Sequence, residues 1–377
     1  MKKMLFRKIL LDYMSFFLIA LFSSSIIIWV FQAVNYLDIM IEDGRDYLVY
    51  INYSLLSFPK ILSKLFAFVL FFSLFYVTIK YENNNELIIF WNFGVNKVEL
   101  MNFIIKFSII LMLIQIILSS IIVPRTQDMA RSFLRTSSIN FFENFIKPQR
   151  FNDTIKGVTI YSEKKDSEGN LYNLYLKKEI DDKNFQLTYA KKGTFKEFNG
   201  IPVLVLFNGE TITEKNNELT NFSFTKSDFP LNNYETNTTT YKKTQEISSL
   251  NLIKCINQIY NLTKQNKISK IENCKKDNLN NIFKEIYKRI IIPFYIPLLV
   301  LITIILIQSS KENINYSKLK LFTFLVGLFF IIFSETTIRL ISENLSKNIV
   351  ITLIPYISFL ILYFYLFRKL NFKYITK

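Results

Sequence analysis

The side chains that perform chemistry in most enzymes are scarce in this sequence. Its 377 residues include no histidine, two cysteines and eight glycines. The lack of histidine excludes Ser-His-Asp and Cys-His catalysis, histidine-ligated zinc and phosphotransfer through histidine. The chain also has no GxxxxGK motif, the glycine-rich loop that holds nucleotide phosphates. These absences leave no site for a nucleotide or a histidine-ligated metal, so we expect no cofactor of the chain's own, and any ATP that the protein uses would be bound by another chain.

A short polar and then amphipathic stretch, residues 81–94, separates two long apolar runs at about 52–79 and 101–123. A helix over about 84–94 would be too short to span a bilayer. Because it is tethered between two segments that are long enough to span, it would lie on the membrane surface or dock in a partner. An ordinary surface loop is the remaining alternative.

The residues at both ends of this stretch favour the helix. Asn84 or Asn85 can cap its N-terminus, and Glu86 places a carboxylate in the first turn, near the positive end of the helix dipole. Gly94 is typical of the position just past a helix C-terminus. The apolar flank between the ends is supplied by Leu87, Ile88, Phe90 and Trp91.

Four cations are candidates for contacts with the anionic phosphates of a lipid. Lys60 and Lys64 lie within the outer portion of the second apolar run, next to Pro59. Ionisable groups inside a span usually face a cavity or a partner, but lysines also extend toward the headgroup layer, and both readings remain open. Arg45 precedes this run and Arg339 ends a later one, where an interfacial anchor is the alternative to a lipid contact.

Composition predicts a membrane protein with a sizeable water-facing part. The chain is 50% hydrophobic with a mean hydropathy of +0.23, which is too high for a typical soluble protein and too low for one buried wholly in lipid. Six apolar runs are long enough to span a bilayer. They cover about 14–34, 52–79, 101–123, 290–307, 319–340 and 349–367, and the third is expected to stop at Pro124.

The stretch between the third and fourth runs has no segment able to cross a bilayer. It contains short alternating segments bounded by turn signals such as Asn208-Gly209. This pattern is the signature of hairpin-linked antiparallel strands, and it predicts a β-sandwich or jelly roll. From Leu250 onward the pattern becomes helical. The predicted strands include 158–161, 171–176, 185–189 and 203–207.

The predicted fold is a membrane α-helical protein with six transmembrane helices, in two groups of three, and an inserted extracytoplasmic antiparallel β-sandwich or jelly-roll domain. The expected boundaries are 1–124, 125–281 and 282–377. Lysines and arginines gather at both termini and at 311–320, which places these segments and the 84–94 stretch in the cytoplasm. The β-rich insert is then outside, where Cys255 and Cys274 could form a disulfide, although the sequence does not decide this.

This layout resembles the LptF/LptG permease family (YjgP/YjgQ), the membrane subunits of the lipopolysaccharide ABC exporter. The resemblance covers nearly the whole chain. The family pattern of a proline in the second helix, followed later by E-L-x-x-x-x-x-x-G, is matched by Pro59, Glu86-Leu87 and Gly94. Members often have a second proline in this helix, where the chain has Ala67.

Further local patterns resemble the same family. Glu285 and Arg289, before Pro293, are similar to an E-x-x-x-R pattern that precedes the fourth helix of its members. The opening strands at 157–161 and 166–171 look like those of the LptF type. The first-helix pattern of W-x-x-Q and a later aspartate is similar to Trp29, Gln32 and Asp38.

The resemblance implies a multi-pass protein of the bacterial inner membrane that exports lipopolysaccharide, with its β-domain in the periplasm. Its implied partners are an LptB-like ATPase dimer, which binds the ATP, an LptG-like paralogous permease, an LptC-like periplasmic bridge protein and lipopolysaccharide; nucleic acid is not among them. The short helix would enter a groove of the ATPase, and closure of the ATPase would move the second and third helices as levers. The residues implied in this coupling are Glu86, Leu87, Phe90, Trp91 and Gly94. Lipid phosphates would meet Arg45, Lys60, Lys64 and Arg339.

Three alternative interpretations remain open. Within the family, the chain could be the LptG paralogue. A membrane enzyme that acts on a lipid or glycan would need convergent carboxylates, and the one cluster so placed, Asp38, Glu42, Asp43 and Asp46, fits a solvated acidic link better. A sensor or anchor whose β-domain binds a partner leaves the short amphipathic helix without a role.

Overall fold

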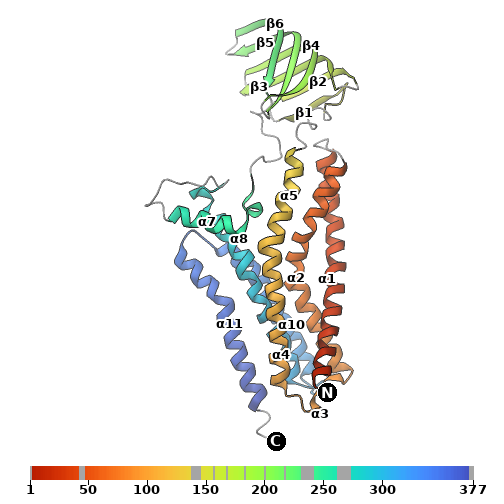
Figure 1. The fold of residues 1–377 in the computed structure, drawn as a ribbon, viewed down its shortest axis with the longest axis vertical. Coiled ribbons are helices and arrows are strands. Elements are labelled where there is room, and N and C mark those ends of the chain that lie inside the picture. The colour runs from red at the N-terminus through yellow and green to blue at the C-terminus, as the bar shows by residue number, and fades with distance from the viewer. Residues whose placement is uncertain are drawn as a thin grey trace. The chain divides into compact units, whose positions relative to one another are not determined.

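The computed structural model describes residues 2–41, 47–136, 146–155, 158–166, 169–181, 184–198, 201–215, 218–230, 242–260 and 273–372. The chain, drawn in Figure 1, divides into two compact units. One unit is helical and consists of Met1–Val30, Ser57–Asp128 and Lys242–Lys377. The other consists of Phe31–Leu56 and Met129–Tyr241 and contains a β-sheet.

Six helical segments among the described residues are long and apolar enough to cross a membrane, which confirms the six predicted spans. Most of the predicted spans are shorter than the observed helices, because polar residues continue the helices beyond the apolar runs. The first span is α1 (Lys2–Ile41), the second α2 (Tyr47–Asn83), the fifth α10 (Tyr316–Leu340) and the sixth α11 (Leu345–Phe372); α3 (Glu86–Asn92) is the short helix between the second and third spans.

The third span does not stop at Pro124, contrary to the prediction. It consists of α4 (Lys97–Ile117), one π-helical turn, η1 (Leu118–Ile122), and α5 (Val123–Thr136). Proline cannot donate a backbone hydrogen bond, but this costs little in the first turn of a helix. Because η1 interrupts the regular hydrogen-bond ladder just before it, Pro124 lies in such a first turn and the helical path continues.

The fourth span is irregular in the same way. Pro293 follows a π-helical turn here as well, within a short 3-10 turn. The predicted run at 290–307 therefore lies within a longer helical path, whose successive elements are η3 (Lys276–Asn278), α8 (Leu279–Ile286), the π turn η4 (Tyr287–Ile291), η5 (Ile292–Phe294), α9 (Tyr295–Ile304) and η6 (Ile305–Gln308).

The core of the helical unit is built around α9. Every residue of α9 is buried, and the fourth span is the most buried of the six. The helices α4, α10 and α11 pack against it. A helix that is apolar on all sides is buried or faces lipid. The fourth span is thus internal, whereas α1, α10 and α11 expose large apolar side chains in the way that suits lipid contact.

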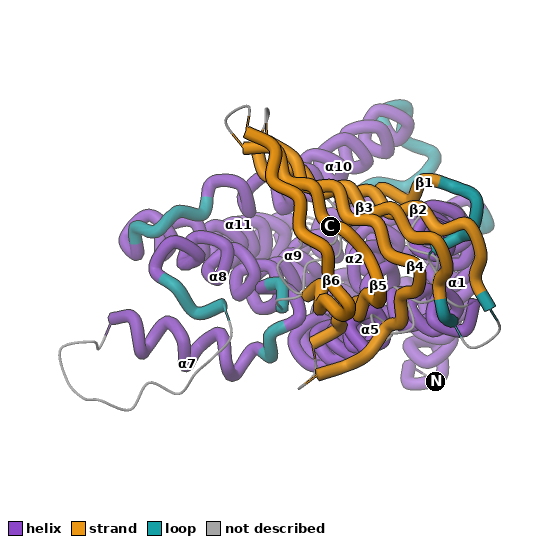
Figure 2. The backbone as a smooth tube through the Cα atoms, turned by 90° about the horizontal axis from the view of Figure 1, so that it is seen from above, coloured by secondary structure: helices purple, strands orange, loops and turns teal. Residues whose placement is uncertain are grey.

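The β-unit contains one sheet whose six described strands follow in the order β1-β2-β3-β4-β5-β6, with every neighbouring pair antiparallel (Figure 2). The inserted antiparallel β-domain is therefore confirmed. The expected sandwich or jelly roll would pair strands that are not consecutive, and the described strands form a meander instead. Hairpin turn signals report only the pairing of consecutive strands, so they could not decide between these topologies. The strands are β1 (Phe151–Ile155), β2 (Val158–Lys165), β3 (Leu171–Asp181), β4 (Asn184–Phe198), β5 (Ile201–Lys215) and β6 (Glu218–Pro230).

The two faces of the sheet differ because side chains alternate along a strand. One face forms an apolar cluster in which Leu174, Leu176, Ala190, Leu204 and Leu206 are buried. On neighbouring strands, an aromatic row contains Phe151, Tyr161, Tyr175 and Tyr189, whose adjacent ring centroids are 5.1, 6.1 and 5.0 Å apart. Such cross-strand pairs stabilise the register of an antiparallel sheet.

The connection back to the helices contains α7 (Ser249–Tyr260), as the helical pattern after Leu250 predicted. Cys255 and Cys274 are joined by a disulfide, with their Cα atoms 5.9 Å apart. Cys255 is buried beside Leu252 and Ile282 in a small apolar cluster. The disulfide and this cluster hold α7 against α8.

Candidate functional site

The short helix α3 is closed at its C-terminus by a hydrogen-bonded reversal of the chain. The N–H of Val95 donates to the carbonyl of Phe90, and the N–H of Gly94 donates to the carbonyl of Trp91, each at 3.0 Å. These two bonds form a Schellman motif, which requires a left-handed residue after the helix. Gly94 supplies it with a φ of +73°. The expected end of the helix at Gly94 therefore has a direct physical cause.

The start of α3 differs from the expected side-chain cap. Asn85 occupies the cap position, but its φ is +61° and its side chain makes no capping bond. Asn84 instead donates from Nδ2 to Oε1 of Glu86 at 3.2 Å, and Lys8 Nζ of α1 lies 3.5 Å from Oε2 of Glu86. The Glu86 carboxylate is thus oriented by two neighbours at the positive end of the helix, and its side chain is partly exposed.

The apolar side chains of α3 divide between two faces. Leu87 and Phe90 are each 2% exposed and belong to the core of the helical unit, so they hold α3 in place. Ile88, Ile89 and Phe93 lie on the other side and are 42–47% exposed. An incoming partner could reach this second group but not the first.

The residues expected to couple to a partner therefore do not share one surface of α3. Glu86 is accessible, whereas Leu87 and Phe90 face inward and Trp91 is half-buried beneath Lys97, whose Nζ lies 5.4 Å from the ring centroid. The sequence placed Ile88 on the apolar flank of this helix but not among the coupling residues, and it did not single out Ile89 or Phe93. A helix of two turns with apolar residues on both sides carries no clear periodicity, so the exposed side could not be recognised from the pattern.

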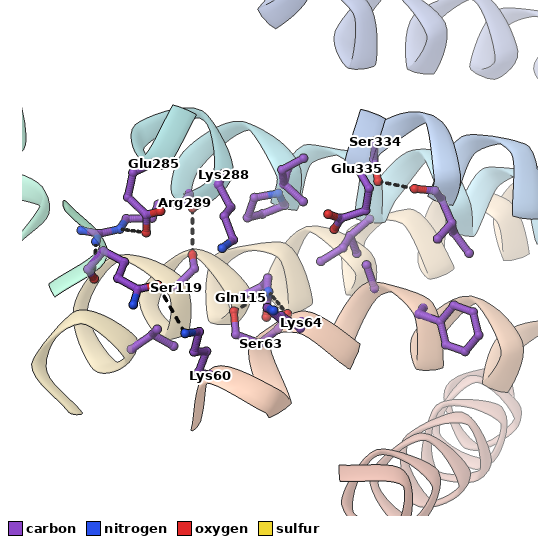
Figure 3. A pocket seen from close by; sticks show the side chains of 18 of the residues that line it. Lys60, Ser63, Lys64, Gln115, Ser119, Glu285, Lys288, Arg289, Ser334 and Glu335 are labelled. Atoms are coloured by element: carbon purple, nitrogen blue, oxygen red, sulfur yellow. Dashed lines mark hydrogen bonds and ion pairs between the residues drawn. The ribbon is translucent and has the colours of Figure 1, made fainter. Parts of the chain in front are cut away.

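A polar cavity lies farther along the helical unit, between α2, the third and fourth spans and α10 (Figure 3). Lys60, Ser63 and Lys64 enter it from α2, and Gln115 and Ser119 enter from the third span. Its apolar wall includes Phe68, Val123, Pro293, Ile296 and Ile331, and its volume is about 80 Å³. A wider cavity of about 570 Å³ shares six lining residues with it, namely Lys64, Phe68, Glu285, Lys288, Ile331 and Glu335.

The cavity lies far from α3 along the second span. Lys60 precedes the last residue of α2, Asn83, by 83 − 60 = 23 positions. At 1.5 Å per residue this is about 35 Å, roughly the thickness of the hydrocarbon core of a bilayer. The two features therefore lie at opposite membrane surfaces if α2 crosses the bilayer.

Cations outnumber anions around this pair of cavities. Lys60 donates to Oε1 of Gln127 at 3.4 Å and to Oε1 of Gln245 at 3.3 Å. Lys64, Lys284 and Lys288 have no ion pair among the described residues. A phosphate would find several positive donors here beside an apolar wall that suits acyl chains. Sequence reasoning had identified Lys60 and Lys64, but Lys284 and Lys288 are brought to them only by the packing of the fourth span.

Arg289 forms a buried polar centre next to the cavity. It is 2% exposed, and its Nε lies 3.0 Å from Oε1 of Glu285. Its other nitrogens donate to the carbonyls of Ile247 and Gln245 at 2.8 and 2.9 Å and to Oγ of Ser249 at 3.0 Å. A buried guanidinium is tolerated only with such partners. Arg289 thus fixes the segment before α7 to the fourth span.

The two π turns meet at this point. Ser119 of η1 donates from Oγ to the carbonyl of Arg289 in η4 at 2.8 Å, and Ser249 donates from Oγ to the carbonyl of Ser120 at 2.7 Å. A π turn shifts the regular hydrogen-bond pattern and leaves a carbonyl without its usual partner. The two serines supply the missing donors, so the irregular turns are held together.

The remaining candidate cations are not gathered here. Arg339 is exposed near the end of α10 and lines neither cavity. Arg45 lies outside the described residues, as do Glu42, Asp43 and Asp46, and the side chain of Asp38 is likewise not described. Glu335 lines both cavities, and no group of three or more potential metal-binding side chains occurs among the described residues.

Comparison with known proteins identifies the family of this chain and a relative. The family model described as lipopolysaccharide export system permease LptF/LptG matches residues 7–369, nearly the whole chain. An uncharacterized protein of Rickettsia prowazekii (strain Madrid E), RP871, is 25% identical over 211 residues. That match covers 55% of this chain and 58% of the Rickettsia protein, so the chain spans little more than half the length of this relative.

Proposed function

This chain belongs to the LptF/LptG family of lipopolysaccharide export permeases, and we propose that it is an LptF-type subunit of an exporter driven by a separate ATPase. In this function it has no catalytic chemistry of its own. It takes lipopolysaccharide from the inner membrane and passes it, through its β-domain, to a periplasmic bridge protein. An LptG-like paralogue completes the permease. The LptF assignment rests on the resemblance of the β2–β3 region to the LptF type.

The observation that carries the proposal is the construction of α3. A seven-residue helix is anchored by Leu87 and Phe90 and presents Ile88, Ile89 and Phe93 beside the Glu86 carboxylate. An apolar patch next to an oriented charge suits a groove lined by apolar residues and a basic group. A cytoplasmic ATPase dimer of the LptB type is the partner that the family implies for this position.

The polar cavity is the proposed contact with the lipid. Lipopolysaccharide carries phosphates next to acyl chains, and the cavity places Lys60, Lys64 and Lys288 next to the apolar side chains of Phe68 and Ile296. We propose that these lysines contact the phosphates at the outer headgroup layer. Arg339 and Arg45 remain proposed contacts at the rim or with a neighbouring subunit.

The disulfide supports the proposed orientation. Disulfides persist in the periplasm and are reduced in the cytoplasm, so Cys255–Cys274 favours a periplasmic position for α7. With an even number of spans, both termini and α3 are then cytoplasmic. The lysines and arginines near the termini and at 311–320 agree with this orientation.

Copurification tests the proposal. The tagged chain is extracted from native membranes in mild detergent, and the associated nucleotide-binding ATPase is quantified for wild type, Glu86→Lys and Ile89→Asp. We expect wild type to retain the ATPase and both variants to lose it by about tenfold, since a reversed charge or a buried carboxylate at the contact costs at least ~1.4 kcal/mol.

The matched control is Glu99→Lys. Glu99 also lies in the first turn of a helix, α4, and pairs with a lysine of α1, Lys2, at 3.1 Å. It is exposed but lies outside the proposed contact, so this variant keeps the ATPase. Absence of an ATPase from the wild-type complex contradicts the exporter assignment, and equal loss in all three variants contradicts the role of α3.

A further inference from the structure

We propose that Glu82 and Lys97 lock the turn between α9 and α10 to the two ends of α3, so that Glu82 acts as a positioning residue for energy coupling. This inference rests on the proposed function. It adds that closure of the ATPase moves the fourth and fifth spans directly, and not only the second and third helices that flank α3. The short helix and the α9–α10 turn then move as one body.

The first half of the lock lies just before α3. Glu82 is 7% exposed, and its Oε1 accepts a hydrogen bond from the backbone N–H of Lys311 at 2.7 Å. Lys311 returns a bond from Nζ to the carbonyl of Asn83 at 2.9 Å. The end of α2 and the α9–α10 turn thus bind each other twice, although 229 positions separate Glu82 from Lys311. A buried carboxylate is costly unless its partner is fixed, so the turn must keep this position.

The second half of the lock lies just after α3. Lys97 is the first residue of α4, and its Nζ donates to the carbonyl of Ile307 in η6 at 2.8 Å. The last carbonyls of a helix lack intrahelical partners and carry partial negative charge, so a lysine stabilises them. The same Nζ lies over the ring of Trp91. One ammonium group therefore joins α3, the start of α4 and the end of the fourth span.

Apolar packing fills the space between these polar contacts. Leu87 and Phe90 of α3 belong to the same buried cluster as Ile305 and Ile307 of η6, together with Val95 in the link to α4. Protein cores are close-packed and transmit displacement instead of absorbing it. A force on α3 therefore passes to η6 through this shared core and through the polar contacts of Glu82 and Lys97.

The locked elements lead to the polar cavity. Pro293 and Ile296 of the fourth span line the cavity, and so do Ile331 and Glu335 of α10. Both spans begin or end at the turn that Glu82 and Lys97 hold. Displacement of α3 would therefore be passed to the cavity wall formed by the fourth span and α10, as well as to the wall that Lys60 and Lys64 form on α2. This is a direct mechanical route from the ATPase to the lipid contact.

The first test separates ATP hydrolysis from transport. The complex copurified with wild type, Glu82→Ala or Glu82→Gln is placed in proteoliposomes with lipopolysaccharide, and lipid released per ATP hydrolysed is measured. Glutamine keeps an oxygen acceptor for the Lys311 N–H, whereas alanine removes it. We expect Glu82→Gln to stay within about twofold of wild type, and Glu82→Ala to hydrolyse ATP while its release per ATP falls about tenfold.

The second test asks whether the turn and the end of α2 remain together. Cysteines at Asn83→Cys and Lys311→Cys are joined by a short bismaleimide; the native cysteines are already joined to each other and do not react. Transport should survive this cross-link at half of the uncross-linked rate or more. Loss of transport on cross-linking would mean that the contact opens in the cycle, which overturns the proposal.

The outcomes of the two proposals can be told apart. If no ATPase copurifies with wild type, the exporter assignment fails first. If wild type transports and Glu82→Ala transports equally well per ATP, only the lock is refuted. If Glu82→Ala does not assemble, the Asn83→Cys/Lys311→Cys variant decides whether the lock is correct. Its transport before cross-linking is the control for its transport afterwards.

Discussion

Arg289 shows how much one residue contributes to the arrangement around the polar cavity. Its guanidinium joins Glu285 on the same helix to backbone carbonyls on both sides of Glu246 and to the hydroxyl of Ser249. Removal of one partner from a buried ion pair leaves an uncompensated charge and typically costs about 3–5 kcal/mol. The segment that enters α7 would then lose its attachment to the fourth span.

We predict that Arg289→Met destabilises the folded protein by about 3 kcal/mol, because methionine fills similar space but leaves Glu285 unpaired. Thermal unfolding of the detergent-solubilised chain measures this as a clear fall in the midpoint temperature. Lys288→Met is the control: Lys288 is the preceding residue and has no ion pair among the described residues. Equal midpoints for the two variants would contradict the structural role of Arg289.

At this scale, residues with a local conformational requirement could be predicted from the sequence. Gly94 ends α3 because the Schellman motif needs a left-handed residue, and this need is visible in the sequence. The burial of Leu87 and Phe90 and the exposure of Ile89 could not be read in the same way. They depend on how α3 is seated in the buried core of the helical unit, which also contains residues of η6 more than 200 positions away.

At the scale of elements, the contact between α2 and α10 sets how closely two spans approach. Gly327 of α10 lies against the ring of Phe71, and a Cβ added at Gly327 would overlap that ring. Phe71 is fully buried, so its ring is surrounded by other side chains. The two helices therefore need a residue without a side chain at this position.

We predict that Gly327→Ala lowers the free energy of unfolding by about 1–3 kcal/mol, the usual penalty for overpacking a filled core. The same substitution in a Phe71→Leu background should cost less by about 1 kcal/mol, since the smaller side chain makes room. Thermal unfolding of wild type, the two single variants and the double variant gives the coupling energy between Gly327 and Phe71. Leu325→Ala, on the exposed side of α10, controls for a general effect of substitutions in this helix. A coupling energy near zero would refute the close contact.

The sequence predicted the elements better than their boundaries. All six spans were recognised because a run of about 20 apolar residues is long enough to cross a bilayer and rarely occurs outside a membrane helix. The passage through Pro124 was missed, because a π turn has no composition of its own and the serine that donates to its carbonyl, Ser249, comes from a distant segment. The central strands were recognised by alternation, whereas β1 and β6 were not: β6 exposes Leu219 and Phe222 and so lacks a regular buried face.

At the scale of the whole molecule, the proposed orientation in the membrane rests on the distribution of charge and on one covalent bond. The distribution of lysines and arginines predicts cytoplasmic termini, and the Cys255–Cys274 disulfide favours an oxidising compartment for α7. Charge acts during membrane insertion and disulfide formation depends on redox conditions, so the two features are independent.

We predict that both cysteines resist a large maleimide when cells are lysed in denaturant without reductant. After reduction, each chain should gain two adducts, visible as a shift on a gel. Cys255→Ser leaves Cys274 alone and should give one adduct without reductant, which serves as the positive control. Two adducts on the unreduced wild-type chain would place α7 in a reducing compartment and contradict the orientation.

The architecture of the molecule was predictable from patterns, but its cavity was not. Two groups of three spans around an inserted β-domain follow from hydropathy and turn signals. The meeting of Lys60 and Lys64 with Lys288 follows only from the packing of the fourth span between its neighbours. A lysine on one helix face carries no information about which distant helix lies opposite.

The most direct test of the proposed exporter function is ATP-driven release of lipopolysaccharide. The complex isolated through this chain is reconstituted with lipopolysaccharide in proteoliposomes, and transfer to a soluble periplasmic acceptor is followed after ATP is added. We expect release that needs ATP, falls about tenfold in Lys60→Glu/Lys64→Glu and Glu86→Lys, and is unchanged in Glu99→Lys. A complex that hydrolyses ATP but releases no lipopolysaccharide, or releases it equally without ATP, would contradict the assignment of this chain as an exporter subunit.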